Sequence, residues 1–193
     1  MKIVKYAAGA LVAVILAVVI IAAYYGIFAE VTIREQDQPA LILIYKKHIG
    51  SYSQVGKVMD ELFSSLKKDN AETTKGFGIY YDNPQNTPAE KLRSVVGCIL
   101  EEKDRGRVNE LKAKYKIQEF PATQVVCSEF PFKGKMSILF GIMKVYPRMF
   151  AYISGKGYAN TPIMEIYDTP NKKIEYIAAK NVSESVFNSF LDD

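Results

Sequence analysis

The residues best suited to chemistry in this chain are a carboxylate and three tyrosines. Glu165 lies in the short apolar stretch PIMEIY, whose alternation places it on the same face of a predicted strand as Tyr167. A carboxylate framed by Tyr167, Tyr80 and Tyr81 would attract an organic cation through its charge and through cation–π contacts. The simpler alternative is an exposed strand glutamate, or one paired with a lysine or arginine on the neighbouring strand.

Nucleophilic and metal chemistry have little support in the sequence. The single histidine, His48, lies in the segment KKHIGS, where a turn residue or a helix cap is a simpler interpretation than a general base. The chain contains no Gly-x-Ser-x-Gly elbow, P-loop, CxxC pair or HExxH motif. Cys98 and Cys127 have no close cysteine or histidine partners in sequence, so they predict neither a metal site nor a disulfide framework. We therefore expect no metal, no cofactor and no enzymatic activity.

An apolar run at residues 7–28 dominates the organisation of the chain. It contains no charged residue, Asn, Gln or Pro, and roughly 20 apolar residues in a helix cross the core of a bilayer. A cleaved signal peptide is the main alternative, but its apolar region is usually only about 7–15 residues long. The bulky Tyr24 and Tyr25 also make a poor cleavage context. We expect a retained transmembrane helix at residues 7–28 after a short N-terminal segment, residues 1–6.

Charge leaves the orientation in the membrane open. The net charge of +4 comes without a dense block of Lys or Arg, so no nucleic-acid partner is expected. Lys2 and Lys5 precede the span, and the positive-inside rule then favours a cytoplasmic N-terminus and a lumenal domain. Asn181 begins an Asn-Val-Ser sequon that could be glycosylated only in the lumen. A single sequon of this kind often arises by chance.

After a linker at residues 29–39, the periodicities predict two units with the same order of elements, strand–helix–strand–strand. The first unit, about residues 40–101, has its elements at 40–46, 52–68, 76–82 and 91–101. The second unit, about residues 122–179, has them at 123–130, 135–154, 162–167 and 173–178. A short helix is expected around residues 108–115, between the units.

The helix at 135–154 is expected to pack through one apolar face and to be kinked or restarted by Pro147. The residues of that face are Met136, Leu139, Phe140, Met143, Tyr146, Phe150 and Ile153. The predicted fold class is α+β: an N-terminal transmembrane helix, then a domain at residues 40–180 and a C-terminal tail at 181–193. In the domain, duplicated β-α-β-β units form a curved antiparallel sheet with both helices on one face. The face that the helices leave open could form a ligand groove.

Four segments resemble a known family: HIGSYSQVGKV, GIYYDNPQNTPAEKLRSVVGCIL, PATQVVCSEFPF and YANTPIMEIYD. They are similar to the testis-expressed protein 264 family of ER-phagy receptors, which has an N-terminal span and a gyrase-inhibitor-like (GyrI-like) domain. The resemblance covers about residues 40–180. In bacterial domains of the GyrI-like type, a glutamate on a strand such as that of Glu165 can meet a cationic ligand in an aromatic groove.

The resemblance implies a span in the endoplasmic reticulum membrane and a domain that faces the cytosol, with the autophagosome as a further location. Lys2 and Lys5 favour the opposite orientation. In the family, a long acidic tail binds ubiquitin-like autophagy modifiers and is linked to recruiting a AAA-type ATPase. This chain ends at Asp193, about a dozen residues after the last predicted strand, so the expectation of these two partners is weakened.

The nearest candidate for an autophagy-modifier motif is Phe187-Asn188-Ser189-Phe190. Such a motif adds a strand to its partner and inserts two alternate side chains into pockets. Its second anchor here is Phe190 rather than Leu, Ile or Val. The alternative, which the apolar spacing favours, is a short helix over residues 183–191 that packs on the domain.

The leading interpretation is a non-enzymatic, single-pass ER membrane protein whose cytosolic GyrI-like domain acts as a receptor or adaptor in selective autophagy of the ER (reticulophagy). The alternative from another class is a membrane-tethered domain that binds a small organic cation and has no autophagy role. A third possibility is a hydrolase, since some GyrI-like domains have been co-opted for hydrolysis, but no motif supports it.

Overall fold

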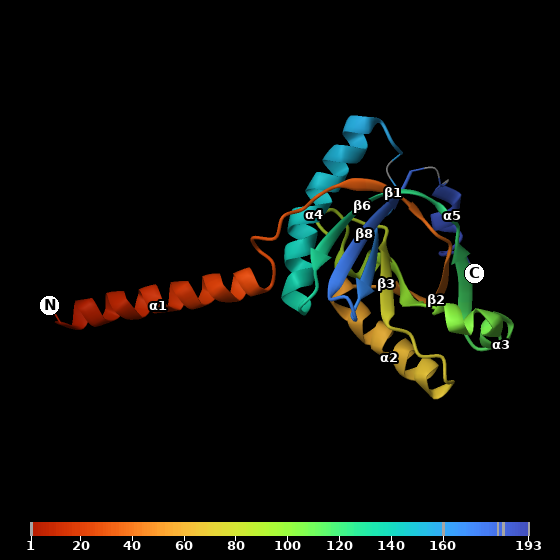
Figure 1. The fold of residues 1–193 in the computed structure, drawn as a ribbon, viewed down its shortest axis with the longest axis horizontal. Coiled ribbons are helices and arrows are strands. Elements are labelled where there is room, and N and C mark those ends of the chain that lie inside the picture. Colours follow the sequence, from red (N-terminus) through yellow and green to blue (C-terminus); the bar gives the residue numbers. More distant parts are fainter. Residues whose placement is uncertain (1, 160, 181, 183, 193) are drawn as a thin grey trace.

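The computed structural model describes residues 2–159, 161–180, 182 and 184–192, as a helix that projects from a mixed α and β domain (Figure 1). The helices are α1 (Lys2–Tyr24), α2 (Val55–Lys68), α3 (Val108–Lys112), α4 (Lys135–Lys156) and α5 (Glu184–Asn188). The strands are β1 (Arg34–Gln38), β2 (Leu41–Ile49), β3 (Lys75–Tyr80), β4 (Arg93–Ile99), β5 (Lys116–Phe120), β6 (Thr123–Pro131), β7 (Met164–Asp168) and β8 (Lys173–Ala179).

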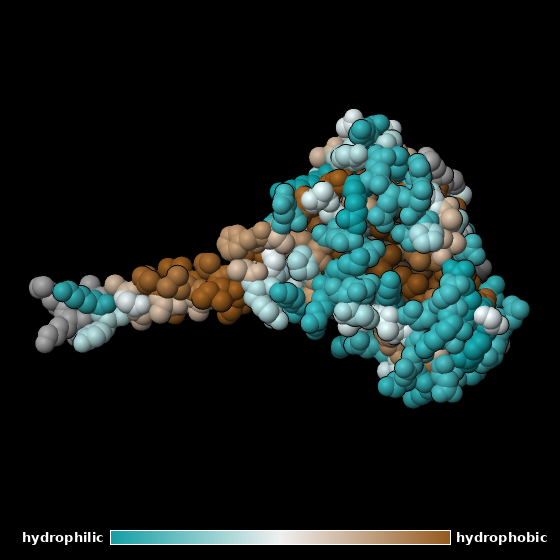
Figure 2. Space-filling view, viewed as in Figure 1, coloured by the Kyte–Doolittle hydropathy of each residue, from teal (hydrophilic) through white to brown (hydrophobic). Residues whose placement is uncertain are grey.

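Helix α1 projects from the domain, and none of the residues of its apolar segment Lys5–Tyr24 is buried. Figure 2 shows this apolar surface beside a domain surface that is largely hydrophilic in that view. The helix ends at Tyr24, four residues before the predicted limit at Phe28. Gly26 explains the earlier end, because it adopts a positive φ of 99° and lies against the ring of Phe130. Among the described residues, α1 is the one helix long and apolar enough to cross a membrane.

The eight strands form one curled antiparallel sheet in the order β1-β6-β8-β7-β3-β4-β2-β5. The first unit supplies β2, α2, β3 and β4, and the second supplies β6, α4, β7 and β8. The two units join where β3 pairs with β7, in the middle of the sheet. Helix α2 contacts β4 and β2, and α4 contacts β6 and β8. The duplicated α+β architecture predicted from the sequence is therefore confirmed.

Two strands were missed by the sequence analysis, and both lie at the edges of the sheet. Strand β1 occupies part of the segment predicted to be a linker and pairs with β6. Strand β5 follows α3 and pairs with β2. Their sequences, REQDQ and KIQEF, are too polar and too short for an apolar alternation to stand out. Edge strands have only one paired side, so polar residues are common in them.

Strand β2 is also longer than predicted and runs to Ile49. His48 therefore lies on a strand and not in a turn, and its Nε2 is 3.2 Å from the backbone oxygen of Ser51. The turn that follows is a short 3-10 helix at Tyr52–Gln54, which leads into α2.

Helix α4 packs through a face that only partly overlaps the one predicted: Ile153 is buried and Phe140 and Tyr146 pack against the core, as expected, but four other residues do not. The buried residues are Ser137, Gly141, Val145, Met149 and Ile153. Met136, Leu139, Met143 and Phe150, which the sequence analysis assigned to the packed face, are 40–60% exposed. The prediction was wrong for these four residues because α4 is apolar on both sides, and the small residues Ser137 and Gly141 allow close approach to the sheet. The helix also continues through Pro147 without a restart.

The C-terminal residues close the sheet face opposite α2 and α4. Helix α5 and the turn after it insert Phe187 and Phe190 into a cluster of buried residues that includes Tyr45, Phe77 and Phe120. The described part of the segment predicted to be a tail thus belongs to the hydrophobic core.

Candidate functional site

Glu165 lies at the centre of the sheet, on β7 and under α4. Its neighbours on the two adjoining strands are Gly78 of β3 and Tyr176 of β8. Only 1% of Glu165 is exposed to solvent. Neither adjoining residue is basic, and no ion pair of Glu165 is found among the described residues. Both simpler alternatives, an exposed glutamate and a cross-strand ion pair, are therefore excluded for the described structure.

Two tyrosine hydroxyls donate hydrogen bonds to the Glu165 carboxylate. The Tyr146 hydroxyl, from α4, donates to Oε1 at 2.8 Å, and the Tyr167 hydroxyl donates to Oε2 at 2.6 Å. The Tyr80 hydroxyl lies 3.0 Å from that of Tyr167. Because the single proton of Tyr167 is committed to Glu165, Tyr80 donates to Tyr167. The result is a chain of donors from both units that ends on one carboxylate.

Burial and hydrogen bonding act against each other on the ionisation of Glu165. Burial raises its pKa to about 6, and the hydrogen bonds from Tyr167 and Tyr146 limit the rise. Burial, together with the neighbouring carboxylate, raises the pKa of Tyr80, Tyr146 and Tyr167. The tyrosines thus remain protonated donors, while Glu165 changes charge near pH 6 and is an anion at neutral pH.

Tyr176 and Ser128 extend this polar cluster across the sheet. They face each other on β8 and β6, and the hydroxyls of both are buried without a hydrogen-bond partner in the described part of the chain. Two glycines make room for the tyrosines. A Cβ on Gly141 of α4 would lie 2.1 Å from the Tyr176 hydroxyl, and one on Gly78 would lie 2.8 Å from the Tyr80 hydroxyl.

The structure brings Glu165, Tyr167 and Tyr80 together as predicted, but it places Tyr81 elsewhere. The Tyr81 side chain packs with the core on the opposite face of the sheet, and its hydroxyl donates to the Phe187 backbone oxygen at 2.7 Å. Successive residues of an extended chain point to opposite faces, so Tyr80 and Tyr81 cannot both meet Glu165.

Sequence reasoning did not assign three aromatic members of the site, namely Tyr52, Tyr146 and Tyr176. The Tyr52 ring contacts the Tyr80 ring edge-on, with centroids 4.8 Å apart. The Tyr146 ring contacts the Tyr176 ring at 5.8 Å. A usable signal was the number of tyrosines at apolar positions of helix 135–154 and strand 173–178, since a buried Tyr hydroxyl usually has a polar partner.

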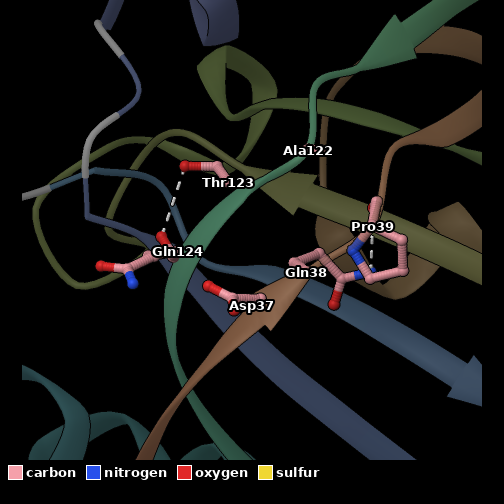
Figure 3. Close-up of a pocket in the computed structure, with 6 residues that line it drawn as sticks. All are labelled: Asp37, Gln38, Pro39, Ala122, Thr123 and Gln124. Atoms are coloured by element: carbon pink, nitrogen blue, oxygen red, sulfur yellow. Dashed lines mark hydrogen bonds between the residues drawn. The ribbon is translucent and has the colours of Figure 1, made fainter.

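Two hollows of the surface lie away from Glu165. One, of about 440 Å³, lies between β1 and β6 and is lined by Asp37, Gln38, Pro39, Ala122, Thr123 and Gln124 (Figure 3). The other, of about 540 Å³, lies where α1 meets the domain and is lined by Tyr24, Phe132, Lys133, Gly134, Thr169 and Lys172. Neither hollow includes Glu165 or its hydrogen-bonding partners. Because only 1% of Glu165 is exposed, a ligand would reach the carboxylate only if the tyrosines around it move.

The candidate autophagy-modifier anchors are inaccessible in the folded domain. Phe187 and Phe190 are 1% and 0% exposed, and their rings contact Phe120 and Tyr45. The helix favoured by the spacing is observed as α5. Asn181, the possible glycosylation site, lies outside the described residues.

The described residues contain no group of three or more His, Cys, Asp or Glu side chains that could hold a metal ion. Cys98 and Cys127 are buried free thiols. Burial raises the pKa of Cys98 to about 12, so this thiol is not a reactive nucleophile at neutral pH.

The fold is that of a known class of domains. Residues 31–178 match the family described as "GyrI-like small molecule binding domain", and the chain belongs to this family. Among solved structures, it shares the fold of the EcmrR C-terminal domain (TM-score 0.53, 14% identity, covering 77% of this chain and 96% of that one). It also shares the fold of SAV2435 bound to tetraphenylphosphonium (TM-score 0.51, 10% identity, covering 78% and 94%).

Two curated proteins are similar over most of the chain. The chain is 34% identical over 154 residues to the testis-expressed protein 264 homolog of Mus musculus. It is 32% identical over the same length to testis-expressed protein 264 of Homo sapiens. In each case the alignment covers 76% of this chain and 48% of the relative, so the chain spans about half the length of these relatives.

Proposed function

We propose that this chain is a non-enzymatic, single-pass protein of the endoplasmic reticulum membrane, whose GyrI-like domain acts on the cytosolic side as a receptor or adaptor in reticulophagy. The supporting observation is its similarity to testis-expressed protein 264 over 154 residues. The unburied apolar helix α1, joined directly to the domain, supports the membrane anchor.

Topology is the first test of this proposal. Intact microsomes that carry the full chain with a C-terminal tag are treated with protease, and glycosylation of Asn181 is read on the same gel. A tag that is digested and a chain that is not glycosylated support the receptor. A protected, glycosylated chain would follow the charges of Lys2 and Lys5 instead and would rule out a cytosolic receptor.

Recruitment of ubiquitin-like autophagy modifiers and of a AAA-type ATPase belongs to the same proposal. Because Phe187 and Phe190 are buried, the folded domain does not offer them to a partner. Pull-down of each partner by the full chain in detergent, beside an ER-turnover assay in starved cells, tests the role. Normal ER turnover after deletion of the chain would argue against the receptor.

A second function, binding of an organic cation, is favoured by one specific observation: a buried carboxylate surrounded by tyrosines. At neutral pH, Glu165 is an anion without a cationic partner among the described residues, and a ligand cation would neutralise it in a low-dielectric site. Tyr52, Tyr80 and Tyr146 are only partly buried, so the cluster reaches towards the surface. SAV2435, which has this fold, was solved with tetraphenylphosphonium, a lipophilic cation.

Titration calorimetry of tetraphenylphosphonium against the full chain in lipid nanodiscs tests this second function. Empty nanodiscs supply the blank, because this cation also partitions into lipid. We expect Glu165→Gln to weaken binding about tenfold or more, since the ion pair is lost, whereas Glu119→Gln on the exposed edge of β5 should leave it unchanged. Binding should also strengthen as the pH rises through about 6, where Glu165 becomes charged. Equal affinities of the two variants would exclude the Glu165 site.

A further inference from the structure

Helix α4 presents an apolar face to solvent, opposite the face that packs on the sheet. Met136, Leu139, Met143 and Phe150 are 42%, 48%, 60% and 40% exposed. Together with Pro147 they recur at helical spacing and form a continuous stripe, which we call the outer stripe. A helix that is apolar on both sides is normally covered on both sides.

The corresponding helix of the first unit, α2, has no such stripe. Its buried residues are Val55, Met59, Leu62 and Leu66, and its outward side chains include Lys57, Asp60, Glu61 and Lys68. Helix α4 contains three lysines and one arginine but no Asp or Glu in 22 residues. The exposed side of α4 is therefore both apolar and basic, which is the composition of helices that lie in the surface of an anionic membrane.

Helix α4 is attached directly to the exit of α1. The Ser137 hydroxyl donates to the Tyr25 backbone oxygen at 3.1 Å. The Lys144 ammonium donates to the backbone oxygens of Ile27 and Ala29 at 2.6 and 2.5 Å. The Lys133 ammonium lies 4.6 Å from the centre of the Tyr24 ring. These contacts hold the first half of α4 against the C-terminal end of α1 and the segment that follows it.

The direction of α4 fits this position. In Figure 1, α4 runs across the line of α1, on the side of the domain from which α1 leaves. If α1 crosses the bilayer, that side of the domain faces the membrane surface, and α4 lies along it. Phe28 lies in the segment that connects α1 to the domain, and 71% of it is exposed. The hollow that includes Tyr24, Lys133 and Lys172 lies where lipid headgroups would be.

We propose that the outer stripe of α4 lies in the interfacial region of the same bilayer that α1 spans. There its apolar side chains enter the headgroup–acyl boundary, typically about 5–10 Å deep, and the exposed basic residues Lys135 and Arg148 meet anionic headgroups. The domain is then held against the membrane in one orientation by two elements, α1 and α4. This inference rests on the membrane anchor proposed above, so its test must report on α1 separately.

The chain has no tryptophan, so a single introduced one reports on its own surroundings. We would reconstitute the full chain in vesicles of phosphatidylcholine and phosphatidylserine, with and without bromine on the acyl chains. The variants are Ile15→Trp in α1, Met143→Trp and Leu139→Trp in the outer stripe, and Asn109→Trp in α3. Residue 109 is exposed, and α3 lies at the end of the domain away from α1 (Figure 1).

We expect emission from Ile15→Trp, Met143→Trp and Leu139→Trp to be quenched about twofold or more by brominated lipid, since bromine quenches on contact within the boundary region. Asn109→Trp should emit as a water-exposed residue and be unaffected. Quenching of Ile15→Trp alone overturns the inference about α4 and leaves the anchor intact. Quenching of none overturns the anchor itself. Blue-shifted but unquenched emission from the outer-stripe variants means that protein, such as a second copy of the chain, covers the stripe, which also overturns the inference.

Discussion

Two β-α-β-β units build this domain, and they carry different side chains at matching places. At the junction in the centre of the sheet, β3 of the first unit supplies Gly76 and Gly78, which lie opposite Tyr167 and Glu165 of β7. On the outside, α2 presents charged residues, whereas α4 presents apolar and basic ones. A repeated backbone pattern thus supports two unlike surfaces and one asymmetric polar site.

The two units contribute different residues to the site and to the contacts with α1. The second unit supplies the carboxylate, two of the tyrosines nearest to it and the helix attached to α1. The first unit supplies the glycine that leaves space at the junction, and also Tyr80 and Tyr52. Four substitutions test this difference between the units, from the largest expected effect on stability to the smallest.

The C-terminal segment follows the second unit in sequence but packs largely on the first. The Phe190 ring lies 5.4 Å from that of Tyr45, and the Lys47 ammonium donates to the Leu191 backbone oxygen at 2.6 Å. We expect Phe190→Ala to lower the free energy of unfolding by about 3–5 kcal/mol, because it leaves a cavity in the core. Urea titration of the full chain in detergent micelles, followed by tyrosine circular dichroism, measures it. A loss below about 1 kcal/mol would mean that this segment is not part of the folded core.

Gly141 is the point of closest approach between α4 and the sheet. A methyl group there would lie 2.1 Å from the Tyr176 hydroxyl and 3.3 Å from the Phe130 ring. We expect Gly141→Ala to cost about 3 kcal/mol, since Tyr176 is fully buried and cannot move aside. The same urea titration measures this cost. If Gly141→Ala is stabilising, α4 must lie farther from β8 than the structure shows.

Glu165 should make stability depend on pH. Its pKa is about 6 in the folded chain against an ordinary 4.5, so between these values the folded state binds more protons than the unfolded state. The contribution of Glu165 to stability is therefore fully present below pH 4.5, and about 2 kcal/mol of it is lost as the pH rises through 6. We expect the free energy of unfolding of the wild type, relative to that of Glu165→Gln, to fall by about this amount between pH 4.5 and 7 in urea titrations. Parallel pH profiles of the two proteins would contradict the raised pKa.

Gly56 lies in α2, in the helix that corresponds to α4, and nothing lies within 4 Å of a Cβ added to it. We expect Gly56→Ala to stabilise the chain by about 1 kcal/mol, because alanine favours the helix more than glycine does. The opposite signs of Gly56→Ala and Gly141→Ala would show directly that the two helices pack differently. Equal changes in the free energy of unfolding for the two variants, measured by urea titration, would mean that the two helices pack alike.

Much of the fold could be predicted from the sequence because its signals are local. The apolar run at residues 7–28, the spacing of Val55, Met59, Leu62 and Leu66, and the alternation around Glu165 each depend on a few neighbouring residues. The edge strands β1 and β5 could not be predicted, since their only strong determinant is the backbone of β6 or β2 beside them. The site was half predicted: Glu165 and Tyr167 share one strand, whereas Tyr146 comes from a helix.

The sequence by itself determined the order of the main helices and strands, their repetition in two units, and that one apolar segment can cross a membrane. It also determined that Tyr80 and Tyr81 point to opposite faces. Only the tertiary structure decided which of them meets Glu165, because that depends on the register between β3 and β7. It likewise decided which apolar face of α4 packs inward, because the sheet accepts the side whose small residues allow the closest approach.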